Sequence, residues 1–219
     1  MTAGKTRAGR PRDTGIDAAV QEAALAALGE VGYRGLAIEA IARQAGTNKP
    51  AVYRRWPSLA ALVLDALGAR LGDIPAPDTG CTICDLADAI KLQLNVFRRI
   101  PPDALAALLA DCNADPALRE TFMATLFQPP RAAVARVLDT AIARGDLRAE
   151  TSRELMLDLL ASLVHYRALF GHAATSDDEV EQAVHALLRG VAVDYDNLVA
   201  ISRANEGDPQ FHPHHAETH

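Results

Sequence analysis

A segment of seven residues near position 50 carries four side chains with the chemistry of nucleic-acid contacts. They are an amide, two cations and a phenol, on Asn48, Lys49, Tyr53 and Arg54. Groups of these types hydrogen-bond to phosphates and to base edges in DNA. Val52 and Trp56 are four residues apart, so on a helix they share one face and pack inward, which leaves the polar groups outward.

A helix-turn-helix is predicted over residues 36–62 to position these groups. Gly46 can adopt the left-handed conformation that ends a helix, and Thr47 is a favoured N-cap for the next one. Pro57 is well placed to start the helix that follows. A unit with this layout places its second helix in the major groove of DNA.

The run AIARQAGTNKPAVYRRWPSLAAL resembles the DNA-binding region of TetR-family transcriptional repressors, in the actinobacterial branch with a Tyr-x-x-aromatic-Pro run. The resemblance covers about residues 13–65. It implies a homodimer, a three-helix N-terminal domain, and a helical C-terminal domain in which a small effector binds and releases a palindromic operator. The residues that correspond to the family's usual DNA contacts are Thr47, Lys49, Pro50, Tyr53, Arg54 and Arg55.

Two positions depart from the family pattern. The family usually has a phosphate-binding lysine where this chain has Leu59, and a Thr or Ser N-cap where this chain has Ala37. Loss of the cap costs about 1 kcal/mol of local helix stability. The departures keep an alternative open: a helical module that binds small molecules or proteins, with weak or no specific DNA binding.

Charge is divided unevenly along the chain, whose net charge is −6. Residues 1–72 hold ten basic and six acidic side chains, whereas residues 73–219 hold twelve and twenty-two. A basic N-terminal third on an acidic body favours a head that faces phosphates.

The N-terminal arm is a second candidate DNA contact. Lys5, Arg7, Arg10 and Arg12 all precede the first acidic residue. The segment from Gly9 to Arg12 resembles the core of an AT-hook, in which Arg-Pro-Arg lies in a narrow minor groove, so Arg10 and Arg12 are candidate contacts. A disordered basic tail that adds only non-specific attraction to DNA is an equal alternative.

The whole chain is predicted to be all-α. We expect a disordered basic arm at residues 1–12, a helix-turn-helix DNA-binding domain at 13–72, a helical ligand-binding and dimerisation domain at 73–201, and a disordered tail at 202–219. Beside the helix-turn-helix, apolar periodicity, capping patterns and Pro/Gly breaks predict helices over residues 14–31, 57–71, 82–99, 102–112, 115–127, 130–144, 152–170 and 177–200.

The last two predicted helices indicate a homodimer. Helix 152–170 is apolar nearly all round, so one face is expected to pack on its own core and the other on a partner. Two helices from each subunit would form a four-helix bundle about a two-fold axis; a larger monomeric core is the alternative. The expected interface residues are Leu155, Leu159, Leu163, Tyr166, Val180, Val184, Leu187 and Val191.

The resemblance also places an effector site inside the C-terminal helices. An apolar cavity with a few polar groups is the usual small-molecule site. The candidates are polar or polarisable residues within apolar stretches: Asn95, Phe97, Cys112, Met123, Phe127, His165 and Tyr166. The expected ligand is hydrophobic, aromatic or amphipathic, and ordinary core packing is the alternative role for each residue.

Catalysis is not expected. Nothing in the sequence orders Cys112 and His165 as nucleophile and base, and there is no Gly-x-Ser-x-Gly turn and no Gly-rich phosphate loop. No apolar run is long enough to span a membrane and no apolar segment follows the basic N-terminus, so we expect a cytoplasmic protein without a membrane partner. No cofactor is expected.

The cysteines, at positions 81, 84 and 112, are an odd set, which disfavours a disulfide framework. Cys81 and Cys84 have the spacing of half a zinc site or of a redox pair, but two adjacent loop cysteines are the favoured interpretation because no second Cys/His pair is near. A frayed polar terminus is favoured over a metal site for the tail histidines, His212, His214, His215 and His219.

Overall fold

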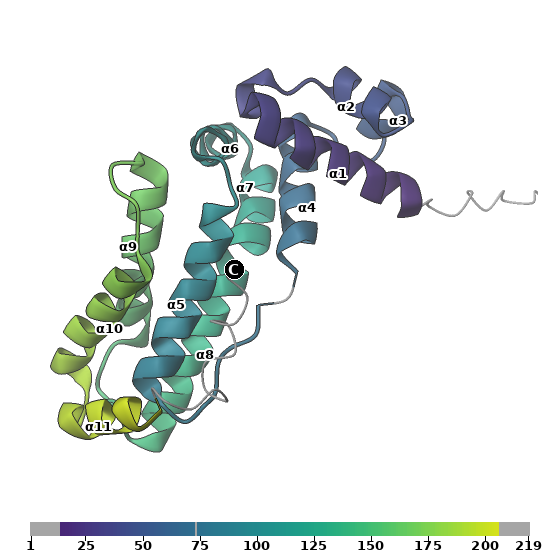
Figure 1. Ribbon diagram of the computed structural model, residues 1–219. Helices are drawn as coiled ribbons and strands as arrows, with labels where there is room; N and C mark the ends of the chain where they lie inside the picture. The colour runs from purple at the N-terminus through teal and green to yellow at the C-terminus, as the bar shows by residue number, and fades with distance from the viewer. Residues whose placement is uncertain (1–13, 73, 206–219) are drawn as a thin grey trace, which may run out of the picture.

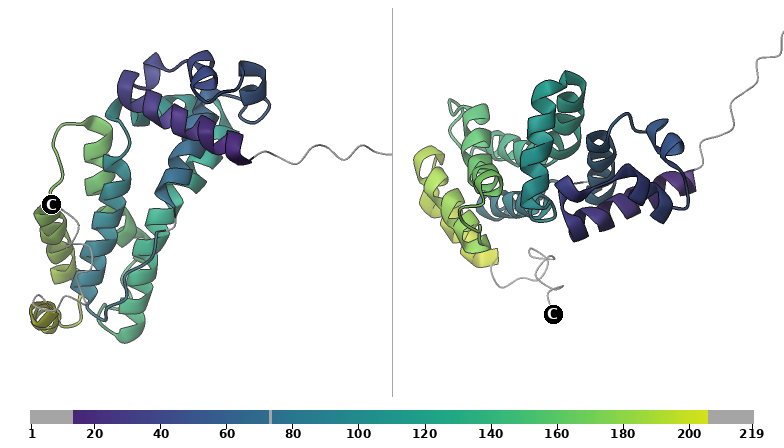
Figure 2. Two further views of the ribbon diagram at one scale, coloured as in Figure 1. Left: turned by 45° about the vertical axis from the view of Figure 1, so that its right-hand side comes forward. Right: turned by 90° about the horizontal axis from the view of Figure 1, so that it is seen from above.

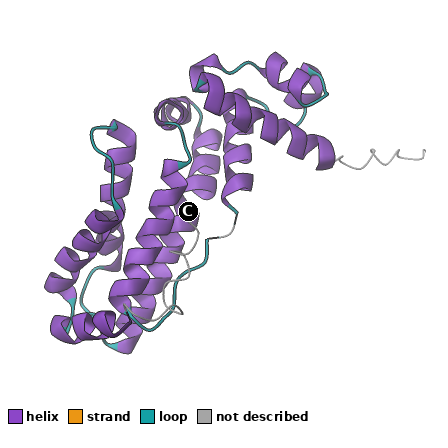
Figure 3. Ribbon diagram, viewed as in Figure 1, coloured by secondary structure: helices purple, strands orange, loops and turns teal. Residues whose placement is uncertain are grey.

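The computed structural model describes residues 14–72 and 74–205, which fold into helices joined by loops (Figures 1 and 3). In chain order the helices are α1 (Thr14–Val31), η1 (Tyr33–Gly35), α2 (Ile38–Gln44), α3 (Lys49–Tyr53), α4 (Leu59–Leu71), α5 (Thr82–Arg98), α6 (Pro102–Ala114), α7 (Pro116–Phe122), η2 (Met123–Phe127), α8 (Gln128–Arg144), α9 (Arg153–Phe170), α10 (Asp177–Val191) and α11 (Tyr195–Asn205). η1 is a 3-10 turn and η2 is π-helical. The predicted all-α fold is confirmed.

Helices α1, α2 and α3 form a small head at one end of the molecule (Figure 1). Their apolar faces meet in one core, in which Val20 of α1, Ile41 of α2 and Val52 of α3 are all fully buried. The three helices therefore hold one another in place through a shared apolar contact, as expected for the predicted helix-turn-helix domain.

Helix α4 ties the head to the larger body. Leu62 belongs to the core of the head, whereas the next residue, Val63, belongs to the core of the body. Near its C-terminal end, α4 approaches η2 so closely that a Cβ on Gly68 would lie 2.4 Å from Thr125 Cγ2. Because α4 is packed on both sides, any displacement of it moves the head relative to the body.

Tyr33 of η1 forms a second tie between head and body. Its backbone N–H donates to Asp103 Oδ2 at 2.8 Å, and its phenol donates to Asp111 Oδ2 at 2.7 Å. Both carboxylates belong to α6. Burial and the bond to Asp111 raise the pKa of Tyr33, so the phenol remains a hydrogen-bond donor.

The body is built around α5. Helices α8, α9, α10 and α11 all pack against it, and α9 and α10 lie side by side on one flank (Figures 1 and 2). The inward face of α5 is buried at Leu86, Ile90, Gln93 and Phe97. This spacing repeats every three to four residues, as the period of an α-helix requires, and it brings one polar residue into the apolar core.

The predicted break between helices 115–127 and 130–144 is absent, because α7, η2 and α8 follow one another without a loop. The helix passes Pro129 and Pro130 through a π-helical turn, in which the N–H of Gln128 donates to the carbonyl of Met123. A proline has no N–H to donate and normally disrupts a helix. The wider turn just before the prolines lets the chain continue in the same direction.

The predicted helix 177–200 is wrong as one element, because the chain breaks between α10 and α11. Ala192 is extended, with φ −66° and ψ 147°. The N–H of Arg148 donates to the carbonyl of Val191 at 3.0 Å, and the N–H of Val193 donates to the carbonyl of Asp146 at 2.9 Å. This pairing with a distant loop replaces helical hydrogen bonds. Helix α11 then runs to Asn205, past the predicted helix end, and the tail histidines lie outside the described residues.

The interpretation of Cys81 and Cys84 as unpaired loop cysteines is also wrong. The two are joined by a disulfide at the start of α5, where Cys81 is the N-cap and accepts a hydrogen bond from the N–H of Cys84 at 3.2 Å. Both are buried, and Cys84 Sγ lies 3.8 Å from Ser202 Oγ of α11. Their short separation lets one turn of helix bring the two sulfurs together.

Candidate nucleic-acid interface and ligand site

The turn between α2 and α3 has the geometry that a helix-turn-helix needs. Gly46 has φ +67°, and the N–H of Thr47 donates to the carbonyl of Ala42 at 2.8 Å, which closes the end of α2. Asn48, not Thr47 as predicted, is the N-cap of α3, because its Oδ1 accepts from the N–H of Ala51 at 3.0 Å. The cap fixes the direction in which α3 leaves the turn.

The inward face of the α3 segment is confirmed. Val52 is fully buried and Trp56 nearly so. The indole N–H of Trp56 donates to Asp65 Oδ2 at 2.7 Å, and Gln21 Nε2 donates to the same oxygen at 2.8 Å. One carboxylate on α4 therefore binds both α1 and the residue Trp56 just after α3, which restricts rotation of α3.

The opposite face of α3 is exposed at Asn48, Lys49, Pro50, Tyr53 and Arg54. Lys49 forms an ion pair with Glu39 of α2, and its Nζ lies 5.7 Å from the centre of the Tyr53 ring. The hydrogen bond from Lys49 lowers the pKa of Glu39. Arg54, by contrast, is exposed and forms no ion pair with any other described residue.

Arg55 has a different environment from the one predicted. It is mostly buried and forms an ion pair with Asp17 of α1, and its Nη1 donates to the carbonyl of Ala51 at 3.2 Å. Its guanidinium is therefore committed to holding α1 against α3. Thr47 is half-buried in the turn, and the predicted contacts Arg10 and Arg12 lie outside the described residues.

The two departures from the family pattern are visible in the head. Ala37 is the N-cap residue of α2 and makes no side-chain capping bond. Leu59 starts α4, packs against the cores of both head and body, and follows Ser58, whose Oγ accepts from the N–H of Ala61 at 3.1 Å. At this position the leucine side chain contributes packing instead of a phosphate contact.

Three predicted ligand residues come together inside the body. The ring of His165 on α9 lies 4.7 Å from that of Phe97 on α5 in an edge contact, and 5.1 Å from that of Phe127 on η2 in a stack. Gln93, which the sequence analysis missed, lies beside them with its Nε2 3.0 Å from His165 Nε2. The sequence does contain a signal for the burial of Gln93, namely its helical spacing with Leu86, Ile90 and Phe97. That spacing places Gln93 on the buried face of α5.

The charge state of His165 follows from its surroundings. Burial, and then the charge of Arg131, lower the pKa of His165 to about 4. The imidazole is therefore neutral at pH 7, and it offers one donor and one acceptor. Arg131 itself pairs with Glu154 and Asp158, both at 2.8 Å.

The other predicted ligand residues are dispersed. Asn95 is exposed and accepts a bond from Arg98 at 3.3 Å. Cys112 is buried on α6, where burial and the neighbouring Asp111 raise its pKa. Met123 is half-buried on η2, and Tyr166 is exposed on α9 with its ring against Phe170. Asn95 and Tyr166 therefore lie on the surface of the subunit, apart from the group around His165.

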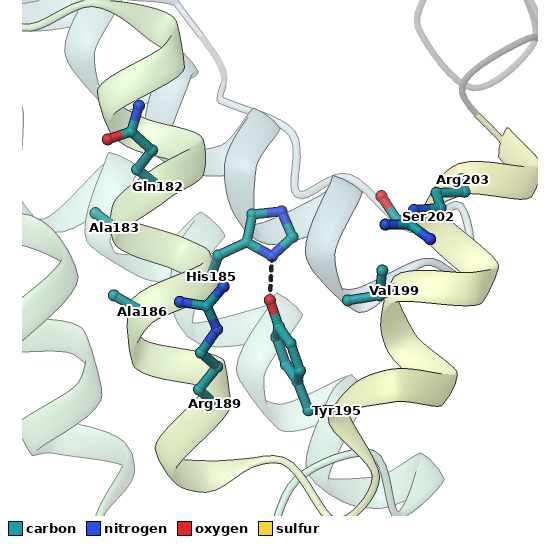
Figure 4. Close-up of a pocket in the computed structure, with 9 residues that line it drawn as sticks. All are labelled: Gln182, Ala183, His185, Ala186, Arg189, Tyr195, Val199, Ser202 and Arg203. Atoms are coloured by element: carbon teal, nitrogen blue, oxygen red, sulfur yellow. Dashed lines mark hydrogen bonds between the residues drawn. The ribbon is translucent and has the colours of Figure 1, made fainter.

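The largest of the described cavities is an open groove of about 750 Å³ between α10 and α11 (Figure 4). In this groove His185 Nδ1 lies 2.8 Å from the hydroxyl of Tyr195, to which it is hydrogen-bonded, and the guanidinium of Arg189 lies 5.5 Å from the centre of the Tyr195 ring. A second cavity of about 360 Å³ lies between α5, α9 and the loop after α9, and Phe97 is in its wall. A third, of about 470 Å³, lies between α1 and α4. Neither Gln93 nor His165 lines any of these three cavities, but Phe97, whose ring contacts that of His165, lines the second.

Helix α9 exposes an unusual number of large apolar side chains. They are more than a third exposed and belong to Leu155, Leu159, Tyr166, Leu169 and Phe170. Leu163, Leu187 and Val191 are half-buried. Val180 and Val184 were assigned wrongly to an interface, because they are fully buried against α5 within the subunit and offer no surface to a partner.

Neither a membrane-spanning helix nor a metal site is found among the described residues. None of their helices is long and apolar enough to cross a membrane. Within the same part of the chain, no three His, Cys, Asp or Glu side chains are grouped so that they could hold a metal ion.

Comparisons with known proteins agree with this geometry. A model described as the tetracyclin repressor-like C-terminal domain matches residues 76–187, and one described as bacterial regulatory proteins of the tetR family matches residues 21–66. The chain is 28% identical over 188 residues to the uncharacterized HTH-type transcriptional regulator YdeS of Bacillus subtilis (strain 168), covering 85% of this chain and 95% of that protein. It is 30% identical over 178 residues to the uncharacterized HTH-type transcriptional regulator Rv1556 of Mycobacterium tuberculosis (strain ATCC 25618 / H37Rv), covering 80% and 84%. The crystal structure of TetR family transcription regulator SCO0332 is similar with a TM-score of 0.65 and 30% identity, covering 80% of this chain and 98% of that one.

Proposed function

The chain belongs to the TetR family of helix-turn-helix transcriptional regulators, and from this membership we propose that it is a ligand-responsive repressor. A homodimer binds a palindromic operator through its two heads, and a small hydrophobic effector bound in the body releases the DNA. No catalytic step is part of this function.

The exposed face of α3 is the observation that carries the proposal. A rigid apolar base, Val52 and Trp56, supports an outer face that presents Lys49, Tyr53 and Arg54. Such side chains supply both phosphate contacts, which position a protein on DNA, and base contacts, which give sequence specificity. The head therefore offers one continuous surface to the major groove.

The exposed apolar face of α9 supports the dimer. Contiguous apolar patches on soluble proteins mark interaction sites, and Leu155, Leu159 and Tyr166 follow one another at helical spacing on this face. In a two-fold dimer the same face of each subunit meets its copy. Leu159→Asp should therefore convert the dimer to a monomer in analytical ultracentrifugation while the helical content is retained.

Substitutions on α3 test the assignment of the interface. Tyr53→Ala and Lys49→Ala should each weaken operator binding by about 1–3 kcal/mol, because each removes a contact with DNA. Both variants should remain dimeric, since neither side chain is buried. Arg119→Ala, which removes an exposed cation from α7 in the body, is the control and should bind as the unmodified protein does. If Tyr53→Ala and Lys49→Ala bind the operator as tightly as Arg119→Ala does, the assignment of α3 as the DNA interface is refuted.

A further inference from the structure

The core of the body contains a polar acceptor that has no partner among the described residues. Gln93 of α5 is fully buried, its Nε2 lies 3.0 Å from His165 Nε2, and its Oε1 accepts no hydrogen bond from any of those residues. A buried acceptor left unsatisfied costs about 1–3 kcal/mol. Folded proteins keep few such groups, and each one calls for an explanation.

The surroundings of this acceptor are aromatic. The rings of Phe97 and Phe127 lie against His165, at 4.7 Å and 5.1 Å between centres. Phe127 is the last residue of the π-helical segment η2, and π-helical turns occur often at functional sites. His165 is neutral at pH 7, because its pKa is lowered to about 4.

A cavity lies beside this group, at the C-terminal half of α5, and is separated from Gln93 by the Phe97 side chain. It has a volume of about 360 Å³, and Phe97 forms part of its wall. Gln93 and Phe97 are four residues apart, so they share one face of α5 about one helical turn apart. For a ligand in the cavity to reach Gln93 Oε1, the Phe97 ring must turn aside.

The cations near the cavity and the histidine are already engaged. Arg98 Nη2 donates to the carbonyl of Thr175 at 2.6 Å, and Arg167 pairs with Glu179 at 2.7 Å. Arg131, whose charge acts on His165, pairs with Glu154 and with a second carboxylate. A carboxylate placed beside Gln93 would therefore be buried without a free counter-charge, which is costly.

We propose that Gln93 Oε1 is the polar anchor of the effector site, and that the effector is a neutral, planar aromatic molecule that carries a hydrogen-bond donor such as a phenolic hydroxyl. This rests on the proposed function in one respect, namely that the body binds an effector. The donor satisfies Oε1, and the aromatic part lies between α5 and α9 in the position that Phe97 vacates.

Three probes of similar shape test the donor requirement on the full-length protein. They are 2-naphthol, which has a donor, 2-methoxynaphthalene, which has none, and 2-naphthoate, which is anionic at pH 7. In calorimetric titrations 2-naphthol should bind about tenfold or more tightly than either of the others, because only it pairs with Oε1 without burying a charge. Equal binding of 2-naphthol and its methyl ether, or no binding of 2-naphthol, would overturn the proposal.

Gln93→Leu tests the anchor itself. Affinity for 2-naphthol should fall about tenfold or more, while affinity for the methyl ether should not change. Gln44→Leu makes the same substitution at an exposed position of α2, in the head, and should leave both affinities unchanged. An unaltered affinity of Gln93→Leu for 2-naphthol would remove the anchor. Should Gln93→Leu not fold, the double variant Gln93→Leu/His165→Phe replaces both polar partners with apolar ones and takes its place in the titration.

The titrations distinguish failure of the proposed ligand site from failure of the proposed DNA-binding function. The titrations are made without DNA, so they report on the ligand site alone. Binding of 2-naphthol without any effect on operator binding would leave the site standing and contradict ligand-responsive repression. Operator binding by a protein that ignores 2-naphthol would leave the DNA-binding function standing and remove this site.

Discussion

The head and the body place their polar groups in opposite ways. In the head, Lys49, Tyr53 and Arg54 stand outside a small apolar core, whereas in the body Gln93 is fully buried and bonded to the partly buried His165. A DNA duplex can be met only at a surface, but a small molecule can be enclosed. The difference implies that the head is ready to bind before DNA arrives, and that unused hydrogen-bonding capacity lies inside the body.

Removal of the support of α3 should have the largest effect. Trp56→Ala deletes a buried side chain of the head and its bond to Asp65, which should destabilise the head by about 3–5 kcal/mol and abolish DNA binding. If the two cores are as separate as the structure indicates, the dimer and the binding of 2-naphthol should persist. Circular dichroism and sedimentation would measure this, and loss of the dimer would show that the cores are one unit.

The close contact of α4 with η2 should have the next largest effect. Gly68→Ala places a methyl group 2.4 Å from Thr125 Cγ2, which should cost about 1–3 kcal/mol and change operator affinity by displacing α4. Thr125→Ser removes that methyl, so the double variant should recover stability and DNA binding. Gly29→Ala is the matched control, since nothing lies within 4 Å of its Cβ position. Additive effects of the two substitutions would contradict a coupling contact.

His165 should make the stability of the body depend on pH. The pKa of His165 is lowered from 6.5 to about 4, so between these values the unfolded chain binds a proton that the folded protein does not. The contribution of His165 to the free energy of unfolding is complete above pH 6.5. It decreases by about 1 kcal/mol per pH unit as the pH falls toward 4. Urea unfolding at several pH values would measure it, and the dependence should weaken in His165→Phe. The same slope in both proteins would refute the assignment.

The smallest effects should separate two neighbouring arginines. Arg54→Ala should lower the slope of log affinity against log salt by about one, because it removes a phosphate contact. Arg55→Ala should instead destabilise the head by about 1 kcal/mol, because Arg55 pairs with Asp17 and is not free to meet DNA. Salt titrations and thermal unfolding of both variants would measure the contrast. An exchange of the two results would reverse the roles assigned here.

The contrast between head and body also separates the residues whose positions the sequence predicts from those whose positions it does not. The outward face of α3 was predictable because Val52 and Trp56 mark the inward one at helical spacing. Gln93 was missed because a lone polar residue on an amphipathic helix is normally assigned to the surface, although its spacing with Ile90 and Phe97 indicates burial. Burial of a polar group becomes visible only when the neighbouring helices are in place.

Long-range packing accounts for the remaining differences between the sequence-based predictions and the structure. An apolar helix face does not reveal whether it meets its own core or a partner, so Val180 and Val184 were assigned to the wrong side. The end of α10 depends on backbone bonds between residues 146–148 and 191–193, which no local pattern predicts. The capping role of Asn48 was a choice between adjacent favourable residues, which only the backbone geometry resolves.

The most direct measurement is footprinting of the purified protein on the intergenic DNA upstream of its own gene, at two salt concentrations. We expect a protected palindrome whose half-sites are about 34–36 Å apart, or a similar whole-turn spacing, and which remains protected in excess competitor DNA. Binding at this DNA that is no tighter than binding to random DNA, with the same steep loss at higher salt, would contradict specific recognition of this DNA by α3.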